Sequence, residues 1–250
     1  MTPQVLAEVM AATWPPVSSR RLGPWTIRDG AGGGKRVSAA TAEGVWPDVN
    51  PPDVNPPDVN PPDADLALAE AAMRALGQRP LFLIRDGDAA LDATLAARGY
   101  RLVDRVVAYA APTALLARPV PPMASFAHWP PLAVARGLWA GGGIGAARLA
   151  VMDRAPGPKT AILARSADRP AGVAFVALHR RDAMLHALEI SPPHRRLGCA
   201  QNILAAAAGW AQEQGADRLS LVVAKANSPA CGLYAKLGMT LVGHYHYRED

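Results

Sequence analysis

The sequence predicts an α/β (α+β) protein made of two small domains. Its 250 residues allow one large domain or two small ones. Half of them are hydrophobic, so a packed core can form and global disorder is excluded. A strand–helix–glycine–strand order occurs twice, and a shift of 139 residues places one occurrence on the other without a gap. This recurrence predicts two related domains, which we place at residues 1–115 and 116–250.

The first occurrence is introduced by a helix. Asp65 can cap this helix, whose apolar periodicity ends at Gly77. Pro80 then precedes a short apolar run of the kind that forms a buried strand. The elements predicted here are helices at 66–76 and 88–98 and strands at 81–84 and 100–110.

A proline-rich repeat precedes this first occurrence, over residues 47–63. The unit Asp-Val-Asn-Pro-Pro occurs three times in succession from Asp48 to Pro62, and Asp63 begins a fourth, broken copy. Paired prolines forbid a helix and favour extended polyproline II. We interpret the segment as a loop lengthened by repeat expansion, which costs little stability. A Pro-rich recognition segment is the alternative.

The second half of the chain follows the same rules. Residues 111–131 are rich in proline and are interpreted as the linker between the domains. Glycines at 141–143 separate two short helices, and Gly215 ends a long alanine-rich helix. The predicted helices are 132–139, 145–153, 197–214 and 228–237, and the predicted strands are 160–165, 171–179, 183–190, 219–224 and 239–247.

The positive charge lies in the second half. Residues 1–120 hold 12 Lys and Arg against 13 Asp and Glu, whereas residues 121–250 hold 14 against 8, so the halves carry −1 and +6. A basic half attracts anions, among them phosphate-bearing cofactors. The chain has no long Lys/Arg block and only 6% aromatic residues, which disfavours nucleic acid as a partner.

The sequence also predicts where the protein resides. No apolar run approaches the ~18–20 residues of a membrane span, so no membrane partner is expected. The first ten residues include Glu8 and lack the basic start of a signal peptide. Two cysteines, Cys199 and Cys231, are too few for a disulfide framework and are interpreted as small buried residues. We therefore expect a cytoplasmic protein. Its oligomeric state cannot be read from the sequence.

The most informative stretch is residues 188–200. A predicted strand runs into an Arg/Gly turn that opens a helix. The first N–H groups of a helix lack partners and carry the positive end of its dipole. Gly198 and Ala200 keep side chains out of the way, and Arg195 and Arg196 add charge. Together these features predict a cradle for a pyrophosphate. The alternative is an ordinary turn with surface arginines.

Two motifs in this half resemble a known family. The pattern R-x-x-G-x-A at 195–200, after I-x-P at 190–192, resembles the acetyl-CoA signature of the GNAT superfamily of N-acetyltransferases. Asn227 and the run LYAKLGM at 233–239 are similar to the family's N…LYxKLGF segment, with Met239 in place of Phe. The order of elements over 125–248 also fits. The resemblance therefore implies two GNAT-like domains, each a mixed, mainly antiparallel sheet flanked by helices.

The resemblance also implies a function. It implies transfer of an acetyl group from acetyl-CoA to a small-molecule or peptide amine, by direct attack in a ternary complex. The tyrosine at position 234 would protonate the departing thiolate; the structural alternative is a core aromatic residue. The acceptor itself cannot be read from the sequence. The implied acetyl-CoA contacts are Leu188, Ile190, Arg195, Arg196, Leu197, Gly198, Cys199, Ala200 and Asn227.

Two residues on the strand entering the loop are candidates for the general base. His186 resembles in placement a catalytic histidine of arylalkylamine N-acetyltransferases, and a neutral imidazole suits the work. Glu189 is the second candidate. Alternation along a strand predicts that these two side chains point to opposite faces, so they would not act together on one proton. The structural alternatives are a satisfied core histidine and a glutamate paired with an arginine.

The first half lacks these motif residues. Leu95 stands at the place of Tyr234 and Asp88 at that of Asn227, and no R-x-x-G-x-G/A occurs. The glycines at 30–34 do not complete a phosphate-loop motif and are interpreted as a hairpin turn. We therefore expect a degenerate GNAT-like domain that shapes the acceptor site. His244 and His246 alternate on the last strand without a third ligand, so we interpret them as strand packing and expect no metal.

The second hypothesis for the whole chain is a non-catalytic, regulatory module that binds acyl-CoA. Such a module predicts binding without turnover, and indifference to substitution of His186 or Glu189.

Overall fold

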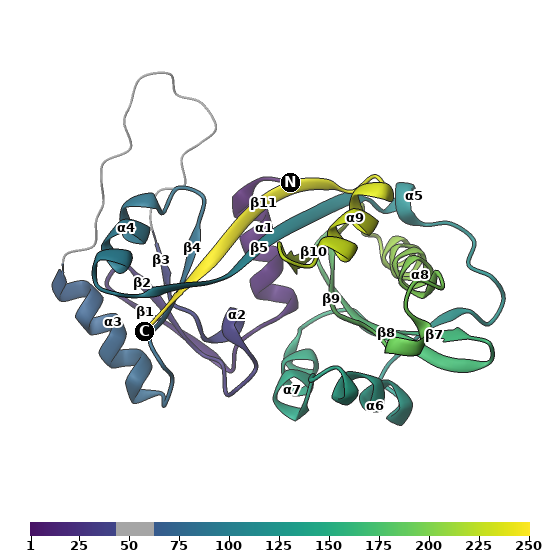
Figure 1. Ribbon diagram of the computed structural model, residues 1–250, viewed down its shortest axis with the longest axis horizontal. Helices are drawn as coiled ribbons and strands as arrows, with labels where there is room; N and C mark the ends of the chain where they lie inside the picture. The colour runs from purple at the N-terminus through teal and green to yellow at the C-terminus, as the bar shows by residue number, and fades with distance from the viewer. Residues whose placement is uncertain (44–62) are drawn as a thin grey trace, which may run out of the picture. The chain divides into compact units, whose positions relative to one another are not determined.

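The computed structural model describes residues 1–43 and 63–250 (Figure 1). The predicted proline-rich insertion at 47–63 lies outside the described residues except for Asp63. The described residues form two compact units that alternate along the chain. Unit 1 comprises Met1–Pro15, Ala108–Val223 and Asn227–Val242, and unit 2 comprises Pro16–Val107, Ala224–Ala226 and Gly243–Asp250. Each unit thus takes residues from both sides of 115, where we predicted a single boundary.

Unit 1 contains a mixed sheet in which antiparallel neighbours predominate. Within this unit the strands follow the order β11–β5–β10–β9–β8–β7–β6. The pairs β6–β7, β7–β8 and β8–β9 are antiparallel, whereas β9 and β10 run parallel. The predicted fold class is confirmed. The strands are β5 (Arg101–Pro112), β6 (Ser125–His128), β7 (Lys159–Ser166), β8 (Arg169–His179), β9 (Asp182–Ile190), β10 (Arg218–Ala224) and β11 (Thr240–Glu249), of which β5 and β11 run on into unit 2.

Helices cover both faces of this sheet. Helix α8 lies on one face, and α6 and α7 lie on the other (Figure 1). Alternation along β8 separates the faces, since Ala174 and Val176 join the core cluster beneath α8, and Val173 and Phe175 point the other way. The helices of unit 1 are α1 (Pro3–Thr13), α5 (Thr113–Leu116), α6 (Ala133–Gly141), α7 (Ala146–Arg154), the 3₁₀ turn Pro192–His194, α8 (Cys199–Glu213) and α9 (Ser228–Lys236).

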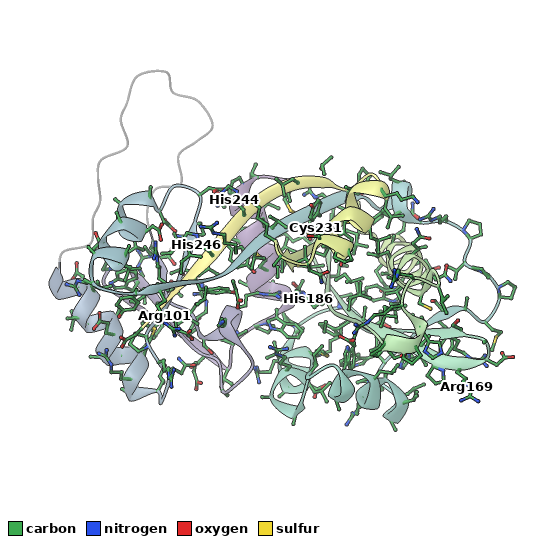
Figure 2. All side chains as sticks on the ribbon, in the orientation of Figure 1. Arg101, Arg169, His186, Cys231, His244 and His246 are labelled. Atoms are coloured by element: carbon green, nitrogen blue, oxygen red, sulfur yellow. The ribbon has the colours of Figure 1, made fainter. Side chains whose placement is uncertain are left out.

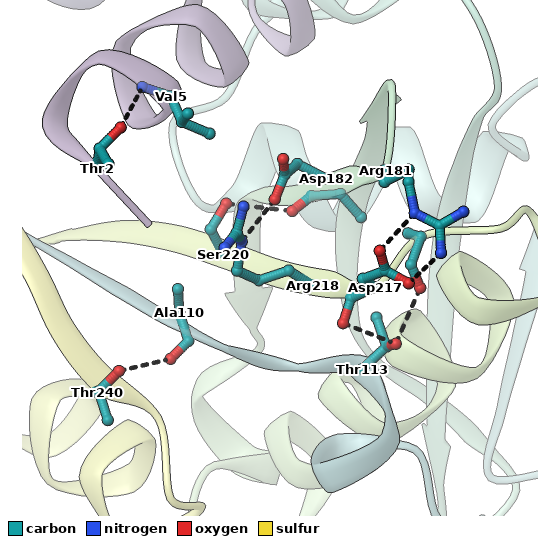
Figure 3. Close-up of polar contacts among 12 residues, drawn as sticks. Thr2, Val5, Ala110, Thr113, Arg181, Asp182, Asp217, Arg218, Ser220 and Thr240 are labelled. Atoms are coloured by element: carbon teal, nitrogen blue, oxygen red, sulfur yellow. Dashed lines mark hydrogen bonds and ion pairs between the residues drawn. The ribbon is translucent and has the colours of Figure 1, made fainter.

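Polar side chains form hydrogen bonds within and between elements of unit 1 (Figure 3). The Arg181 guanidinium makes two hydrogen bonds of 2.5 Å to the Asp217 carboxylate, a bidentate arrangement. The buried Thr113 hydroxyl donates to the carbonyl of Ala216 at 2.9 Å. Thr2 caps helix α1, since its hydroxyl accepts the N–H of Val5.

Unit 2 has its own sheet and core. Strands β1 (Ser18–Leu22), β2 (Trp25–Asp29) and β3 (Thr41–Ala42) form a three-stranded antiparallel sheet. Strand β4 (Leu81–Arg85) pairs antiparallel with the end of β11. The helices are α2 (Lys35–Ser38), α3 (Asp63–Ala75) and α4 (Ala89–Ala97). Buried residues of the core include Trp25, Leu66, Met73, Phe82, Leu95 and Tyr100.

The two histidines of β11 lie beside carboxylates of unit 2 (Figure 2). His244 Nε2 is 2.6 Å from Asp86 Oδ1, and His246 Nε2 is 2.8 Å from Asp92 Oδ1. The Arg248 guanidinium also contacts Asp92 Oδ1, at 2.6 Å. This hydrogen bond, and the neighbouring His246, hold the pKa of Asp92 below its ordinary value. These histidines thus pair with carboxylates.

The segment predicted as a linker contains two elements that were not predicted from the sequence. Helix α5 and strand β6 both lie within 111–131. Strand β6 is only four residues long and pairs with β7 at the sheet's edge, where one neighbour suffices. The prolines of this segment flank the strand in the sequence, and they are the reason why a linker was predicted here. The glycines at 30–34 form a turn that leads into the short helix α2, not a hairpin.

No helix among residues 1–43 and 63–250 is long and apolar enough to cross a membrane.

Candidate functional site

The loop between β9 and α8 takes the backbone shape that the glycine at 198 predicts. Gly198 is the N-cap of α8 with a φ of 81°, in the left-handed region that favours glycine. A Cβ added there would meet no atom within 4 Å, so the backbone faces open space. Arg196 also has a positive φ, of 64°, which turns the chain sharply before the helix. The loop therefore exposes main chain at the start of α8.

The beginning of α8 is electrically suited to an anion. Among the described residues, no side chain accepts a hydrogen bond from the first-turn N–H groups of this helix as an N-cap. Those N–H groups carry the positive end of the dipole of a 15-residue helix. Arg195 and Arg196 are both exposed beside them. The residues present therefore fit a diphosphate group.

Strand β9 is irregular immediately before this loop. Its parallel ladder with β10 pairs Asp182 with Arg218 and continues to Leu185 with Leu221. On the other side, Phe175 of β8 pairs with His186, whereas Val173 pairs with Glu189. Three steps along β9 therefore oppose two steps along β8, which is a β-bulge. Ala187 sits in the bulge with a φ of 51°. The bulge redirects β9 where its pairing with β10 ends.

The bulge corrects our prediction that His186 and Glu189 face opposite sides of the sheet. Residues directly opposite each other in a ladder share a face, so His186 lies with Phe175 and Glu189 lies with Val173. Phe175 and Val173 are two residues apart and share one face. His186 and Glu189 therefore lie on the same face, because the extra residue at the bulge shifts the alternation by one.

His186, labelled in Figure 2, contacts side chains of α1 and β8 and of Trp14, which follows α1. Only 3% of it is exposed. Its Nε2 atom lies 2.9 Å from the Thr13 hydroxyl of α1. The Trp14 ring lies 5.0 Å from the imidazole and the Phe175 ring 6.1 Å from it, measured between centroids. This candidate base is thus held in one position by α1 and β8.

Glu189 lies at the open end of β9. Its side chain is 22% exposed and its Oε1 accepts from the Arg195 guanidinium at 3.4 Å. A Cβ at Gly142, which follows helix α6, would lie 2.7 Å from Glu189 Oε2, so only glycine lets the carboxylate occupy this position. The same arginine donates from its Nε to the carbonyl of Ile190 at 3.1 Å. Glu189 is thus the more accessible of the two candidate bases, and it is ion-paired.

Tyr234 lies on helix α9 within the core of unit 1. It is 4% exposed, and its ring centroid is 5.7 Å from that of Tyr109 on β5. Burial, with a smaller contribution from the nearby Cys231, raises the pKa of Tyr234 to about 12. The phenol is therefore protonated at neutral pH, as a proton donor must be.

The structure brings several of the predicted contact residues around one core. Cys199 and Tyr234 belong to the core cluster beneath α8, and Leu188 and Ile190 pack against it. Leu197 is 61% exposed in the loop, and Ala200 lies in the first turn of α8. Asn227 has a structural task, since its side chain caps α9 by accepting the N–H of Ala230 at 3.3 Å. Its cofactor role stays a prediction.

Sequence reasoning missed three residues that shape this site. Fully buried Trp139 of α6 donates its indole N–H to the carbonyl of Ala187 at 2.8 Å and so holds the bulge. Gly172 leaves room for Ile190, because a Cβ there would lie 2.4 Å from the Ile190 side chain. Thr13 contacts His186 across 173 residues of sequence. Their roles depend on contacts distant in sequence, although Trp139 on a short amphipathic helix is a detectable signal.

Comparison with known proteins agrees with this geometry. Residues 124–239 match the acetyltransferase (GNAT) family. The uncharacterized N-acetyltransferase YobR of Bacillus subtilis is 34% identical over 59 residues, which are 24% of this chain and 24% of that relative. The match therefore spans about a quarter of the curated relative's length.

Solved structures share the fold over nearly the whole chain. A GCN5-related N-acetyltransferase from Kribbella flavida is 18% identical with a TM-score of 0.71, and the alignment covers 100% of this chain and 96% of that one. A tandem GNAT protein from the clavulanic acid biosynthesis pathway is 14% identical with a TM-score of 0.60, covering 98% and 87%. A GCN5-related N-acetyltransferase from Sphaerobacter thermophilus is 14% identical with a TM-score of 0.59, covering 78% and 70%.

The resemblance inferred from the two motifs is thus confirmed, and both motifs fall on the loop and helices that those motifs require. Residues 124–239 are therefore similar to the acetyltransferase (GNAT) family, and the chain shares the fold of GCN5-related N-acetyltransferases.

Proposed function

We propose that the protein transfers an acetyl group from acetyl-CoA to the amine of a small molecule or peptide, by direct attack in a ternary complex. The observation that carries this proposal is the loop at 195–200, in which a left-handed Gly198 opens α8 toward solvent beside two arginines. The family match over 124–239 supports acetyl-CoA as the molecule bound there. We also propose that unit 2 is the degenerate GNAT-like copy.

The residues of unit 1 divide the binding work. Bound acetyl-CoA would supply the reactive thioester. The N–H groups of the first turn of α8, with Arg195 and Arg196, would hold its pyrophosphate. Among the described residues, the ladder between β9 and β10 ends at Leu185. We propose that the main chain beyond that point, near Leu188 and Ile190, holds the pantetheine arm. Leu197, Cys199, Ala200 and Asn227 complete the proposed contacts.

Two side chains would move protons. Tyr234 would donate its phenolic proton to the departing thiolate, and its raised pKa keeps that proton in place beforehand. His186 would accept the proton of the attacking amine, because an imidazole is the side chain whose ordinary pKa lies nearest neutral pH. Glu189 lies on the same face and is the second candidate. Its pairing with Arg195 ties it to the loop.

Paired substitutions decide between the two bases. The His186→Gln variant should lower kcat/KM by about 10²-fold or more and abolish the acidic limb of the pH profile, since the base must be unprotonated to act. Glu189→Gln should keep that limb and lower kcat/KM less. The measurement is the pH dependence of kcat/KM for wild type and both variants. The reverse pattern would assign the base to Glu189.

The activity itself is tested by release of free thiol from acetyl-CoA across a library of amines. The proposal expects turnover with at least one class of amine. The competing hypothesis, a regulatory module that binds acyl-CoA without chemistry, expects saturable binding of acetyl-CoA in calorimetry and no thiol release with any amine. Absence of both acetyl-CoA binding and thiol release would refute both hypotheses.

A further inference from the structure

The first fifteen residues are part of unit 1, although Pro16–Val107, the larger part of unit 2, separates them in sequence from the rest of unit 1. Met1–Pro15 belongs to unit 1. Glu8 of α1 pairs with Arg180 at 3.6 Å, and Arg154 of α7 donates to the carbonyl of Pro15 at 3.4 Å. Leu6, Val9 and Met10 are buried. An ion pair at the middle of α1 and a hydrogen bond just beyond its end thus join this segment to other parts of unit 1.

Thr13, at the last position of α1, presents its hydroxyl to His186. Its side chain is fully buried, and its hydroxyl donates to the carbonyl of Val9 at 2.6 Å, one turn earlier in the helix. A hydroxyl has one hydrogen to donate and two lone pairs to accept with. Since that hydrogen is directed at Val9, the 2.9 Å contact with His186 requires the imidazole Nε2–H to donate to Thr13.

This arrangement has a consequence for the protonation of the ring. In a neutral imidazole one nitrogen carries the hydrogen and the other carries the lone pair. If Nε2 is the donor, the lone pair resides on Nδ1. The ring cannot easily turn over to exchange its nitrogens, because the Trp14 and Phe175 rings lie within 5.0 and 6.1 Å of it. The neighbour in sequence, Trp14, therefore helps to keep the orientation that Thr13 selects.

We propose that Thr13 is a positioning residue for His186: its hydroxyl accepts the Nε2–H and fixes the neutral tautomer that has its basic lone pair on Nδ1. The catalytic use of that lone pair rests on the function proposed above, whereas the tautomer is a property of the folded chain alone. Helix α1 would thus supply the acetyltransferase unit with a residue that lies outside the segment matched by the family, 124–239.

The test compares Thr13→Val, which keeps the shape of the side chain and removes the hydroxyl, with Thr13→Ser, which keeps the hydroxyl. Thr113→Val is the matched control, because Thr113 is also buried in unit 1 and its hydroxyl also donates to a backbone carbonyl. The tautomer of His186 is read from the nitrogen chemical shifts of ¹⁵N-histidine-labelled protein at a pH where histidines are neutral. The spectrum of His186→Gln identifies its signals among the six histidines.

The expected result is a protonated Nε2 in wild type, in Thr13→Ser and in Thr113→Val, and a shift toward protonated Nδ1 in Thr13→Val. With an active amine substrate, Thr13→Val should also lower kcat about tenfold with little change in KM. This loss is smaller than the about 10²-fold or more expected when the base itself is removed, because His186 is still present. Thr13→Ser should restore kcat. A protonated Nδ1 in wild type overturns the proposal, and so does a Thr13→Val spectrum identical to wild type. Absence of turnover in wild type overturns the proposed function and leaves the spectra to judge Thr13.

Discussion

The Gly198→Glu variant should lose acetyl-CoA binding. Its carboxylate would stand at the first turn of α8, where the pyrophosphate is proposed to bind, and like charges repel. We expect the dissociation constant to rise at least ~100-fold, which corresponds to about 2.8 kcal/mol. A non-glycine residue at a φ of 81° also costs about 1–2 kcal/mol of folding stability. Calorimetric titration with acetyl-CoA measures the binding, and thermal unfolding measures the stability.

Gly215→Glu is the matched control for this substitution. Gly215 follows α8 at its other end, has a φ of 84°, and a Cβ added there would also meet no atom within 4 Å. The control thus introduces the same charge and the same backbone strain about 25 Å away, at 1.5 Å per helical residue. It should lose stability and bind acetyl-CoA as wild type does. Equal affinities in Gly198→Glu and Gly215→Glu would refute the assignment of the loop to the cofactor.

The Tyr234→Phe variant should slow turnover by about 10²–10⁴-fold, the range for loss of a general acid. KM for acetyl-CoA should change little, because phenylalanine keeps the buried ring and removes only the hydroxyl. Since burial raises the pKa of Tyr234 to about 12, the wild-type phenol stays protonated up to about pH 11. Wild-type kcat should therefore show no loss from this group as pH rises from neutral toward that value.

Tyr109→Phe provides the control for Tyr234. Its ring is the immediate aromatic neighbour, at 5.7 Å, so the substitution removes a phenol from the same surroundings. Steady-state rates should stay close to wild type in Tyr109→Phe and collapse in Tyr234→Phe. Comparable rates in wild type and Tyr234→Phe would end the acid assignment, and an equal loss in both variants would assign the effect to packing.

The parts of this fold that the sequence predicts depend on local signals. Gly77, Gly99, Gly215 and Gly238 all adopt a positive φ near the ends that they were expected to impose on helices. The predicted helix and strand bounds from residue 132 onward lie within two residues of the observed ones. The Arg/Gly loop was also readable, because the helix start and its left-handed glycine are fixed by neighbouring residues.

The parts that could not be predicted depend on distant contacts. The bulge at Ala187 reverses the expected faces of His186 and Glu189, and alanine carries no local preference for a positive φ. That conformation is held by Trp139, 48 residues away. Thr13 meets His186 across a still longer separation, so neither periodicity nor motif spacing could bring them together.

The division of unit 1 along the chain has a consequence for the order in which the protein is made. Ribosomes deliver residues 1–15 first, yet their packing partners, residues 108–242, emerge only after most of unit 2. The apolar side chains of Leu6, Val9 and Met10 therefore stay exposed to solvent until those partners have been made. An eleven-residue helix is marginal by itself, so this segment gains stable structure only after β8 and β9 have been made. Completion of unit 1 is thereby tied to the synthesis of residues up to 242.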